Sequence, residues 1–368
     1  MLSLDGVACS RSWYARCMRA PLTEVLSLVQ IVSQSSSGTL LALAFVFSLV
    51  VSGVSSLVLA DSLEKVGARF RFTEGLLGVV TALGANTPEM SSAITAIAQG
   101  QHDLGVGLII GSNIFNLAAL LGLSAVFANG FRIRRSAVIL NGSVAFCVTV
   151  IGTALVFGVL SAALAILLIA LIVIPYIAVS AIRPEQLARW PIPQPLCLLL
   201  QRVVADTDRE SRTDATPPRA SRMESLAIVP AVVSIVGASV VLVQSAVEIG
   251  ARLALPQAVI GTLVLASLTG LPNLIAALRL ALAGRGEAVL SEAFNSNTLN
   301  VLAGLCLPAL IVGFGSLSRR ASFAVWTLLA MTLLLVTVAA IGGRLTRREG
   351  VSVVVAYLAF VGLVIVGV

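Results

Sequence analysis

Five polar side chains lie inside two strongly apolar stretches between Leu83 and Leu123, where polar groups are costly if the chain crosses a membrane. The five are Asn86, Glu89, Ser112, Asn113 and Asn116. An acidic or basic residue at the centre of a bilayer costs roughly 3 kcal/mol on insertion scales, so such residues usually face a cavity or an ion pathway. Glu89 is therefore the first candidate for a functional residue.

The same pattern of residues returns in the second half of the chain, 184 positions later. The matching pairs are Pro88 with Pro272, Gly100 with Gly284, Asp103 with Glu287, Ser112 with Ser296, Asn113 with Asn297, and Asn116 with Asn300. Self-similarity at one fixed spacing indicates an internal duplication. Pro88 and Pro272 fall in the middle of apolar segments, where a missing N–H and a ring clash are expected to break a helix.

Helical spacing places the polar residues on shared faces, because positions three or four apart lie on the same side of an α-helix. The sets are Ala82, Asn86 and Glu89; Ser112 and Asn116; Ala266, Thr269 and Asn273; and Glu292, Ser296 and Asn300. We expect the four faces to converge on one cavity. Its carboxylate, amide, hydroxyl and backbone carbonyl oxygens suit Na⁺, Ca²⁺ or Mg²⁺ better than zinc or copper.

Two short motifs in the first half carry a resemblance to a known family. Gly84–Glu89 reads GANTPE and Gly111–Asn116 reads GSNIFN, which resembles the first α-repeat of the sodium/calcium exchanger superfamily. The second half has LTGLPN (Leu268–Asn273) and NSNTLN (Asn295–Asn300) in the corresponding places. The motifs cover about a quarter of the chain, and the paired signature is more specific than either half alone.

The resemblance implies a secondary active cation antiporter with alternating access, which has no cofactor and takes Na⁺, Ca²⁺ or H⁺ as transported substrates. Carried over by position, the cation-binding roles fall on Ala82, Asn86, Glu89, Ser112, Asn116, Ala266, Thr269, Asn273, Ser296 and Asn300. Side-chain ligands of a metal ion would be Glu89, Asn116, Asn273 and Asn300. No catalytic residue is expected, because the spans lack a Ser-His pair and paired aspartates.

The second repeat departs from the family pattern in its charge. Asn273 stands where the family has a second glutamate, so Glu89 is the single family-type acid and would neutralise Ca²⁺ by half. An uncompensated charge is heavily penalised where the dielectric is low. Two alternatives stay open: Glu292 could supply a displaced second acid, or the protein could exchange monovalent cations and protons on Glu89. A transport-incompetent membrane scaffold is a third reading.

The composition is that of a polytopic membrane protein. The chain of 368 residues is 58% hydrophobic and 11% charged, with a mean hydropathy of +1.03. Apolar runs of about 20 residues can each cross the bilayer as a helix. We expect ten such spans, at about 39–61, 75–98, 104–127, 137–157, 159–181, 226–249, 257–282, 288–314, 322–342 and 350–368.

The fold class expected is therefore all-α integral membrane, with ten transmembrane helices as two inverted-topology repeats of five. Five spans per half is an odd number, so the second half must enter the membrane from the opposite face, and the substrate site of such transporters lies where the repeats meet. The expected organisation is a polar tail (1–38), the first repeat (39–182), a Pro-rich cytoplasmic linker (183–224) and the second repeat (225–368).

The positive charges predict the orientation. With both termini outside, the cytoplasmic side collects 18 of the 24 Lys and Arg residues, as the Lys/Arg bias of cytoplasmic loops requires. The net charge of +7 then reflects topology, with weak attraction to anionic lipid as a secondary effect. We expect a multi-pass protein of a cell membrane whose partners are small inorganic cations and the bilayer, without nucleic acid; the oligomeric state is left open.

Some of the small and polar residues are interpreted as structural. Asn113 and Asn297 lie off the face defined by Ser112 and Asn116, and amide side chains commonly hold transmembrane helices together. Gly107 and Gly111 have the G-x-x-x-G spacing that lets two helices approach closely.

Overall fold

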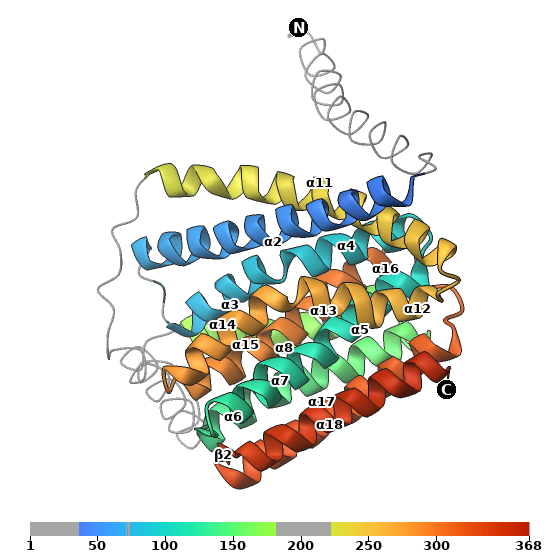
Figure 1. Ribbon diagram of the computed structural model, residues 1–368. Helices are drawn as coiled ribbons and strands as arrows, with labels where there is room; N and C mark the ends of the chain where they lie inside the picture. Colours follow the sequence, from blue (N-terminus) through green and yellow to red (C-terminus); the bar gives the residue numbers. More distant parts are fainter. Residues whose placement is uncertain (1–36, 71, 73, 182–221, 368) are drawn as a thin grey trace, which may run out of the picture.

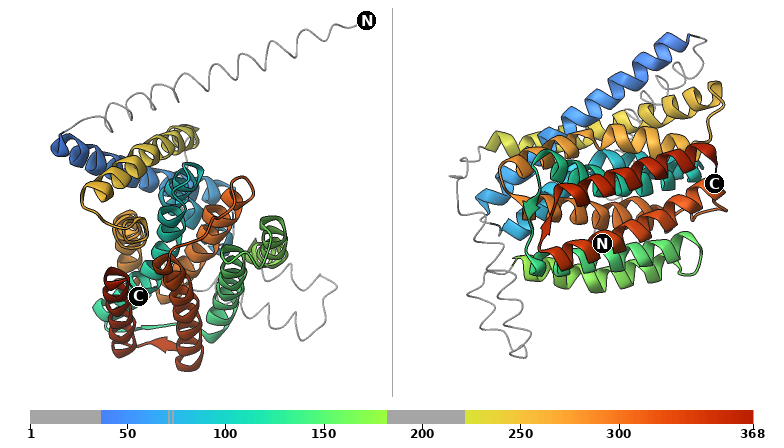
Figure 2. Two further views of the ribbon diagram at one scale, coloured as in Figure 1. Left: turned by 90° about the vertical axis from the view of Figure 1, so that its right-hand side faces the viewer. Right: turned by 60° about the horizontal axis from the view of Figure 1, so that its bottom comes forward.

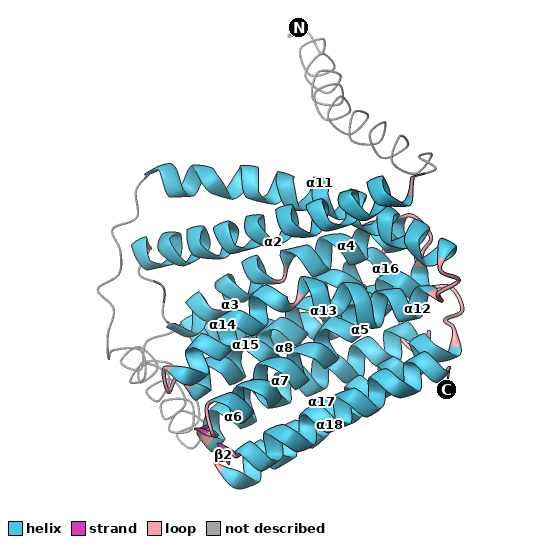
Figure 3. Cartoon of the chain, viewed as in Figure 1, coloured by secondary structure: helices cyan, strands magenta, loops and turns pink. Residues whose placement is uncertain are grey.

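The computed structural model describes residues 37–70, 72, 74–181 and 222–367. Nearly all of them are helical, and the exceptions are short loops and two strands of two residues each (Figure 3). The predicted tail (1–38) and linker (183–224) lie almost wholly outside the described residues, so both remain predictions.

The first half folds into helices that follow the first five expected spans (Figure 1). They are α2 (Gly38–Arg69), α3 (Glu74–Ala85), α4 (Thr87–Ala98), α5 (His102–Asn116), the π-helical segment η1 (Leu117–Leu123), α6 (Ser124–Phe127), α7 (Arg135–Val156) and α8 (Ala162–Ala181). The strand β1 (Phe131–Arg132) lies between α6 and α7. Helix α2 extends eight residues beyond the apolar run expected to end at residue 61, because charged residues continue the helix past the apolar core.

The second half repeats this layout. Its elements are α11 (Arg222–Arg252), α12 (Gln257–Val259), the π-helical η2 (Ile260–Leu265), α13 (Ala266–Thr269), α14 (Leu271–Leu282), α15 (Gly286–Leu299), the π-helical η3 (Asn300–Cys306), α16 (Leu307–Ala309), α17 (Arg319–Gly342), β2 (Arg344–Leu345) and α18 (Arg347–Val366). The segments η1 and η3 occupy corresponding places in the two halves, which agrees with a duplication.

The lengths and compositions of the helices are those of a multi-pass membrane protein. In the described part of the chain, seven helices are long and apolar enough to cross a membrane, or eight if the bent pair Gln257–Thr269 and Leu271–Leu282 counts as one span. The residues of the other two expected spans fold as α3 with α4 and as α15 with η3 and α16, which are not among these seven or eight and carry polar residues of the candidate site.

The helices are layered around one buried span. Helices α2 and α11 lie along each other at one edge of the bundle, and α17 and α18 lie at the opposite edge (Figures 1 and 2). The most apolar window of α5, η1 and α6 is completely buried. Helix α2 turns a stripe of small polar residues inward, including Ser48, Ser52 and Ser56, while Phe47 on its outer face is 71% exposed. Small residues inside and large apolar residues outside are typical of packing in lipid.

The central span touches the second repeat through glycine. A Cβ at Gly111 would collide with the backbone of Thr262 in η2, and one at Gly261 would collide with the backbone carbonyl of Leu104. These positions require glycine because backbone lies directly against backbone. The close helix packing expected from Gly107 and Gly111 is therefore confirmed, and it joins α5 to η2.

Candidate cation-binding site

Both repeats interrupt a helix at the same position. Helix α3 ends at Ala85 and α4 begins at Thr87, with Asn86 between them. In the second half α13 and α14 are separated by Gly270, 184 positions later, and their axes differ by 47°. Each proline lies in the first turn of the helix after the break, where its missing N–H is tolerated. The predicted breaks are confirmed, two residues before the prolines.

Asn86 links the two repeats through hydrogen bonds. Its Nδ2 donates to Ser296 Oγ at 2.8 Å and to the carbonyl of Ala82 at 2.6 Å. Its Oδ1 accepts from Asn273 Nδ2 at 3.3 Å and from Asn300 Nδ2 at 3.5 Å. All of these side chains are buried. The helices α3, α14 and α15 therefore meet at Asn86, as their polar faces predicted.

The central helix α5 joins this network through Asn113. Asn113 Oδ1 accepts from Asn300 Nδ2 at 3.0 Å, and Asn113 Nδ2 donates to the backbone carbonyl of Asn297 at 3.3 Å. The interhelical bond expected for Asn113 is confirmed. Sequence reasoning missed its second role, which is to hold the side chain of Asn300, because Asn113 lies off the helical face used to select ligands.

Glu89 stands apart from the amide network in its hydrogen bonding. It is 0% exposed, one turn after Asn86 in α4. Neither carboxylate oxygen has a hydrogen-bond partner among the described residues. The same holds for Ser112 Oγ and for both polar atoms of the Asn116 side chain. A buried carboxylate needs a counter-charge, a proton or several hydrogen bonds to offset its lost hydration, so these oxygens are available to a cation.

The other predicted ligands hold different positions. Thr269 Oγ1 donates to the carbonyl of Leu265 at 2.8 Å, which leaves its oxygen able to accept or to ligate. The carbonyl of Ala266 accepts from the N–H of Gly270 at 3.2 Å, across the second break. Glu292 lies one turn before Ser296 on α15 and is half-buried, with no hydrogen bond or ion pair to any described residue. No hydrogen bond joins Glu292 to Glu89 in the described part of the chain.

A second buried polar cluster lies beside α15. Tyr176 of α8 has its hydroxyl 2.6 Å from Asn141 Oδ1 and 2.6 Å from Asn295 Oδ1, and Asn295 Nδ2 donates to Ser291 Oγ at 3.1 Å. It ties α7, α8 and α15 together. The sequence gives little signal for this cluster, because Asn141, Tyr176 and Asn295 come from three different helices.

The charge of the site is set by few groups. Among the described residues there is no group of three or more His, Cys, Asp or Glu that could hold a metal ion together. The predicted ligands of the four helical faces include two acidic side chains. Glu89 is fully buried, and Glu292 lies one turn before Ser296 on α15. The arrangement offers the carboxyl group of Glu89 with many neutral oxygen donors, a donor set suited to hard cations.

A cavity of about 460 Å³ lies between α2 and the two breaks. Its lining includes Ser52 of α2, Pro88 and Pro272 after the breaks, and Thr269 before the second break. Thr269 is the predicted ligand on its wall. The cavity therefore lies against both helix breaks, and most of its lining outside α2 comes from the second.

The family model for sodium/calcium exchanger proteins matches residues 40–183 and 225–366 of the chain. The inner membrane protein YrbG of Escherichia coli is 33% identical over 84 residues, which are 23% of this chain and 26% of that protein. The chain thus spans about a quarter of that relative's length in the match. The putative antiporter CaxA of Alkalimonas amylolytica is 25% identical over 295 residues, covering 77% of this chain and 84% of its own.

The fold is also found in a solved structure. The crystal structure of the H⁺/Ca²⁺ exchanger CAX superposes with a TM-score of 0.64 over 89% of this chain and 86% of the other, at 13% sequence identity. At that identity the likeness shows a shared fold.

Proposed function

The chain belongs to the sodium/calcium exchanger family of cation antiporters, and we propose that it exchanges cations across a membrane by alternating access around Glu89. The observation that carries the proposal is the complete burial of Glu89 without a hydrogen-bond partner among the described residues. A carboxylate in that position is expensive unless a cation or a proton offsets its charge. Binding and release of the offsetting ion is the step that an antiporter needs.

We propose that the other ligands come from both halves of the chain. Asn86, Asn116, Asn273, Ser296 and Asn300 would contribute amide and hydroxyl oxygens, and the carbonyls of Ala82 and Ala266 would contribute at the two breaks. The repeats would be inverted and contain ten spans in all, since each half has five segments, an odd number, and the linker would lie on the face from which the second half enters the membrane. The distribution of Lys and Arg favours both termini outside and the linker in the cytoplasm.

The amide network bears on which cation is carried. Asn273 occupies the place of a second acid and donates its Nδ2 to Asn86, so it presents a hydrogen-bond donor toward the site rather than a negative charge. One carboxylate fully neutralises Na⁺ or H⁺ and leaves a net charge of +1 on Ca²⁺. This observation favours exchange of monovalent cations or protons as the second candidate beside sodium/calcium exchange, unless Glu292 supplies the missing charge.

A flux experiment tests the proposal. The purified protein would be reconstituted into liposomes, and internal Ca²⁺, Na⁺ and pH would be followed under opposed gradients for the wild type and Glu89→Gln. Sodium-driven calcium movement that Glu89→Gln abolishes would support sodium/calcium exchange. Sodium or proton exchange without calcium would support the second candidate. Absence of every flux would contradict antiport and favour the scaffold reading.

A further inference from the structure

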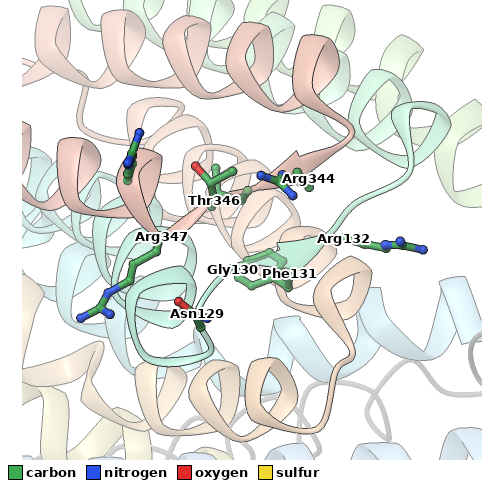
Figure 4. Close-up of a pocket in the computed structure, with 9 residues that line it drawn as sticks. Asn129, Gly130, Phe131, Arg132, Arg344, Thr346 and Arg347 are labelled. Carbon is green, nitrogen blue, oxygen red and sulfur yellow. The ribbon is translucent and has the colours of Figure 1, made fainter.

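A second concave site lies at one end of the bundle, away from Glu89. Loops on either side of β1 and β2 form a pocket of about 580 Å³, shown in Figure 4. The two strands pair antiparallel, with Phe131 opposite Leu345 and Arg132 opposite Arg344. The pocket is lined by Asn129, Gly130, Phe131, Arg132, Arg344, Leu345, Thr346, Arg347 and Arg348. Four of the nine lining residues are arginine, and none is acidic.

The backbone of the pocket is built for close approach. Gly130 has a φ of +87°, and a Cβ there would lie 3.0 Å from the carbonyl oxygen of Leu345. Asn129 before it also has positive φ, at 58°. This turn brings the loop after α6 against the start of α18, so residues more than 200 positions apart line one pocket. The position of the arginines is therefore fixed by the fold.

The arginines have no acidic partners in the described structure. The two nearby acids are engaged elsewhere: Glu287 pairs with Arg134 at 3.2 Å, and Glu349 accepts from the N–H and the hydroxyl of Thr346, both at 2.7 Å. No ion pair is formed by Arg132, Arg344, Arg347 or Arg348 with a described residue. Their side chains are exposed. Figure 4 shows the labelled Arg132 and Arg347 extending in different directions from the loops that line the pocket.

The positions of both arginine pairs are electrostatically unfavourable in the absence of an anion. Arg132 and Arg344 are direct cross-strand neighbours, and like charges in that relation destabilise a strand pair. Arg347 and Arg348 lie in the first turn of α18, where the helix dipole is positive and favours anions over cations. A bound anion would relieve both costs at once.

The matching positions of the other repeat do not carry these charges. At the positions 184 residues away, Ser316, Leu160, Ala163 and Leu164 correspond to Arg132, Arg344, Arg347 and Arg348. The loop bias of Lys and Arg accounts for positive charge on one side of a membrane. It does not account for four arginines from two distant loops around one pocket.

We propose that this pocket binds the phosphate group of an anionic ligand. Guanidinium groups recognise phosphate through paired hydrogen bonds. We favour a phospholipid headgroup as the source, because large apolar side chains within three residues of the lining residues are exposed: Phe127 at the end of α6 (64%), Ile341 near the end of α17 (81%) and Val351 on α18 (45%). Acyl chains can lie on that surface while the headgroup meets the arginines.

The test has a lipid arm and a free-anion arm. In the lipid arm, the protein is reconstituted with equal amounts of phosphatidylglycerol and phosphatidylcholine, and the retained lipid is counted by native mass spectrometry. In the other arm, inorganic phosphate is titrated onto delipidated protein while the melting temperature is followed. The variants are Arg132→Gln/Arg344→Gln, and the control is Arg135→Gln, which removes an exposed arginine from the same end without lining the pocket.

We expect the wild type to retain phosphatidylglycerol selectively. The affinity of the double variant for phosphatidylglycerol should be lower by about tenfold or more. The control should bind as the wild type does. Stabilisation by inorganic phosphate without lipid preference would support the phosphate site and identify a free anion as its source. The proposal is overturned if the wild type shows neither effect, or if the control weakens binding as much as the double variant.

A second double variant, which keeps both positive charges, tests whether a loss of binding comes from misfolding. Arg132→Lys/Arg344→Lys retains both positive charges and the orientation signal, but lysine cannot form the paired contacts of a guanidinium. It should fold normally and still bind more weakly than the wild type. Equal binding by this variant would show a general charge effect and contradict a built phosphate site. Exchange activity is not the readout in either arm, so failure here is distinct from failure of the proposed antiport.

Discussion

Restoring an acid at Asn273 tests the charge argument of the cation site most sharply. Asn273 is 2% exposed and donates to Asn86 at 3.3 Å, across the boundary between the repeats. Asn273→Glu would place a second carboxylate in the site beside Glu89. We predict that it converts the site to one that prefers Ca²⁺ over Na⁺.

The size of the effect follows from the charges. Two unit charges 4 Å apart interact by about 4 kcal/mol at an effective dielectric constant of 20, so a second carboxylate attracts Ca²⁺ by about twice that amount. Burying the new charge costs several kcal/mol, which offsets much of the gain. A remainder of about 3 to 4 kcal/mol corresponds to a rise in calcium affinity of roughly two to three orders of magnitude.

Thermal unfolding in detergent measures this without transport. Without Ca²⁺, Asn273→Glu should lower the melting temperature, because two carboxylates share a poorly solvated site. Saturating Ca²⁺ should reverse the loss, since a ligand at 100 times its dissociation constant stabilises the folded state by about 2.7 kcal/mol. Asn273→Gln is the control, with the same side-chain length and no charge. Calcium stabilisation that is equal in wild type, Asn273→Glu and Asn273→Gln would refute the reasoning.

Three further substitutions test the packing around the site by thermal unfolding. Asn86→Ala removes the group that links the repeats and leaves buried amides without partners, so we expect a loss of about 2 to 4 kcal/mol; a neutral result would show that the network is not formed. Gly111→Ala should cost about 1 to 3 kcal/mol of stability, because the opposing backbone cannot move aside. Its control, Gly78→Ala, has open space around the added Cβ and should be neutral or stabilising by up to about 1 kcal/mol. Equal effects of the two substitutions would contradict the close contact at Gly111. Tyr176→Phe should cost about 1 to 3 kcal/mol, because Asn141 Oδ1 and Asn295 Oδ1 lose the hydroxyl as a partner. An unchanged melting temperature would show that the hydroxyl is not bonded there.

The large-scale features were accessible from the sequence because each depends on a local rule. Apolar runs placed the helices, and the shift of 184 positions revealed the duplication. Pro88 and Pro272 predicted the broken helices. The actual breaks fall at Asn86 and Gly270, because a proline fits the first turn of a new helix and the interruption must therefore come before it.

Features that depend on two distant segments could not be predicted in this way. The pairing of Arg132 with Arg344 involves strands of two residues, too short for an alternating pattern to be recognised. The π-helical turns shift the helical phase locally, so spacing by three or four residues loses accuracy beyond Asn116 and Asn300. Asn113 was set aside for a different reason, because it lies off the helical face of Ser112 and Asn116, although its Oδ1 accepts a hydrogen bond from the predicted ligand Asn300.

Direct binding of labelled cations tests the central claim, that Glu89 holds the exchanged ion. Equilibrium binding of ²²Na⁺ and ⁴⁵Ca²⁺ to the purified protein would be measured for the wild type, Glu89→Gln and Glu292→Gln, with size-exclusion profiles confirming that each is folded. We predict saturable binding of at least one of these cations by the wild type and by Glu292→Gln, and its loss in Glu89→Gln. Binding by folded Glu89→Gln that equals the wild type would contradict the account.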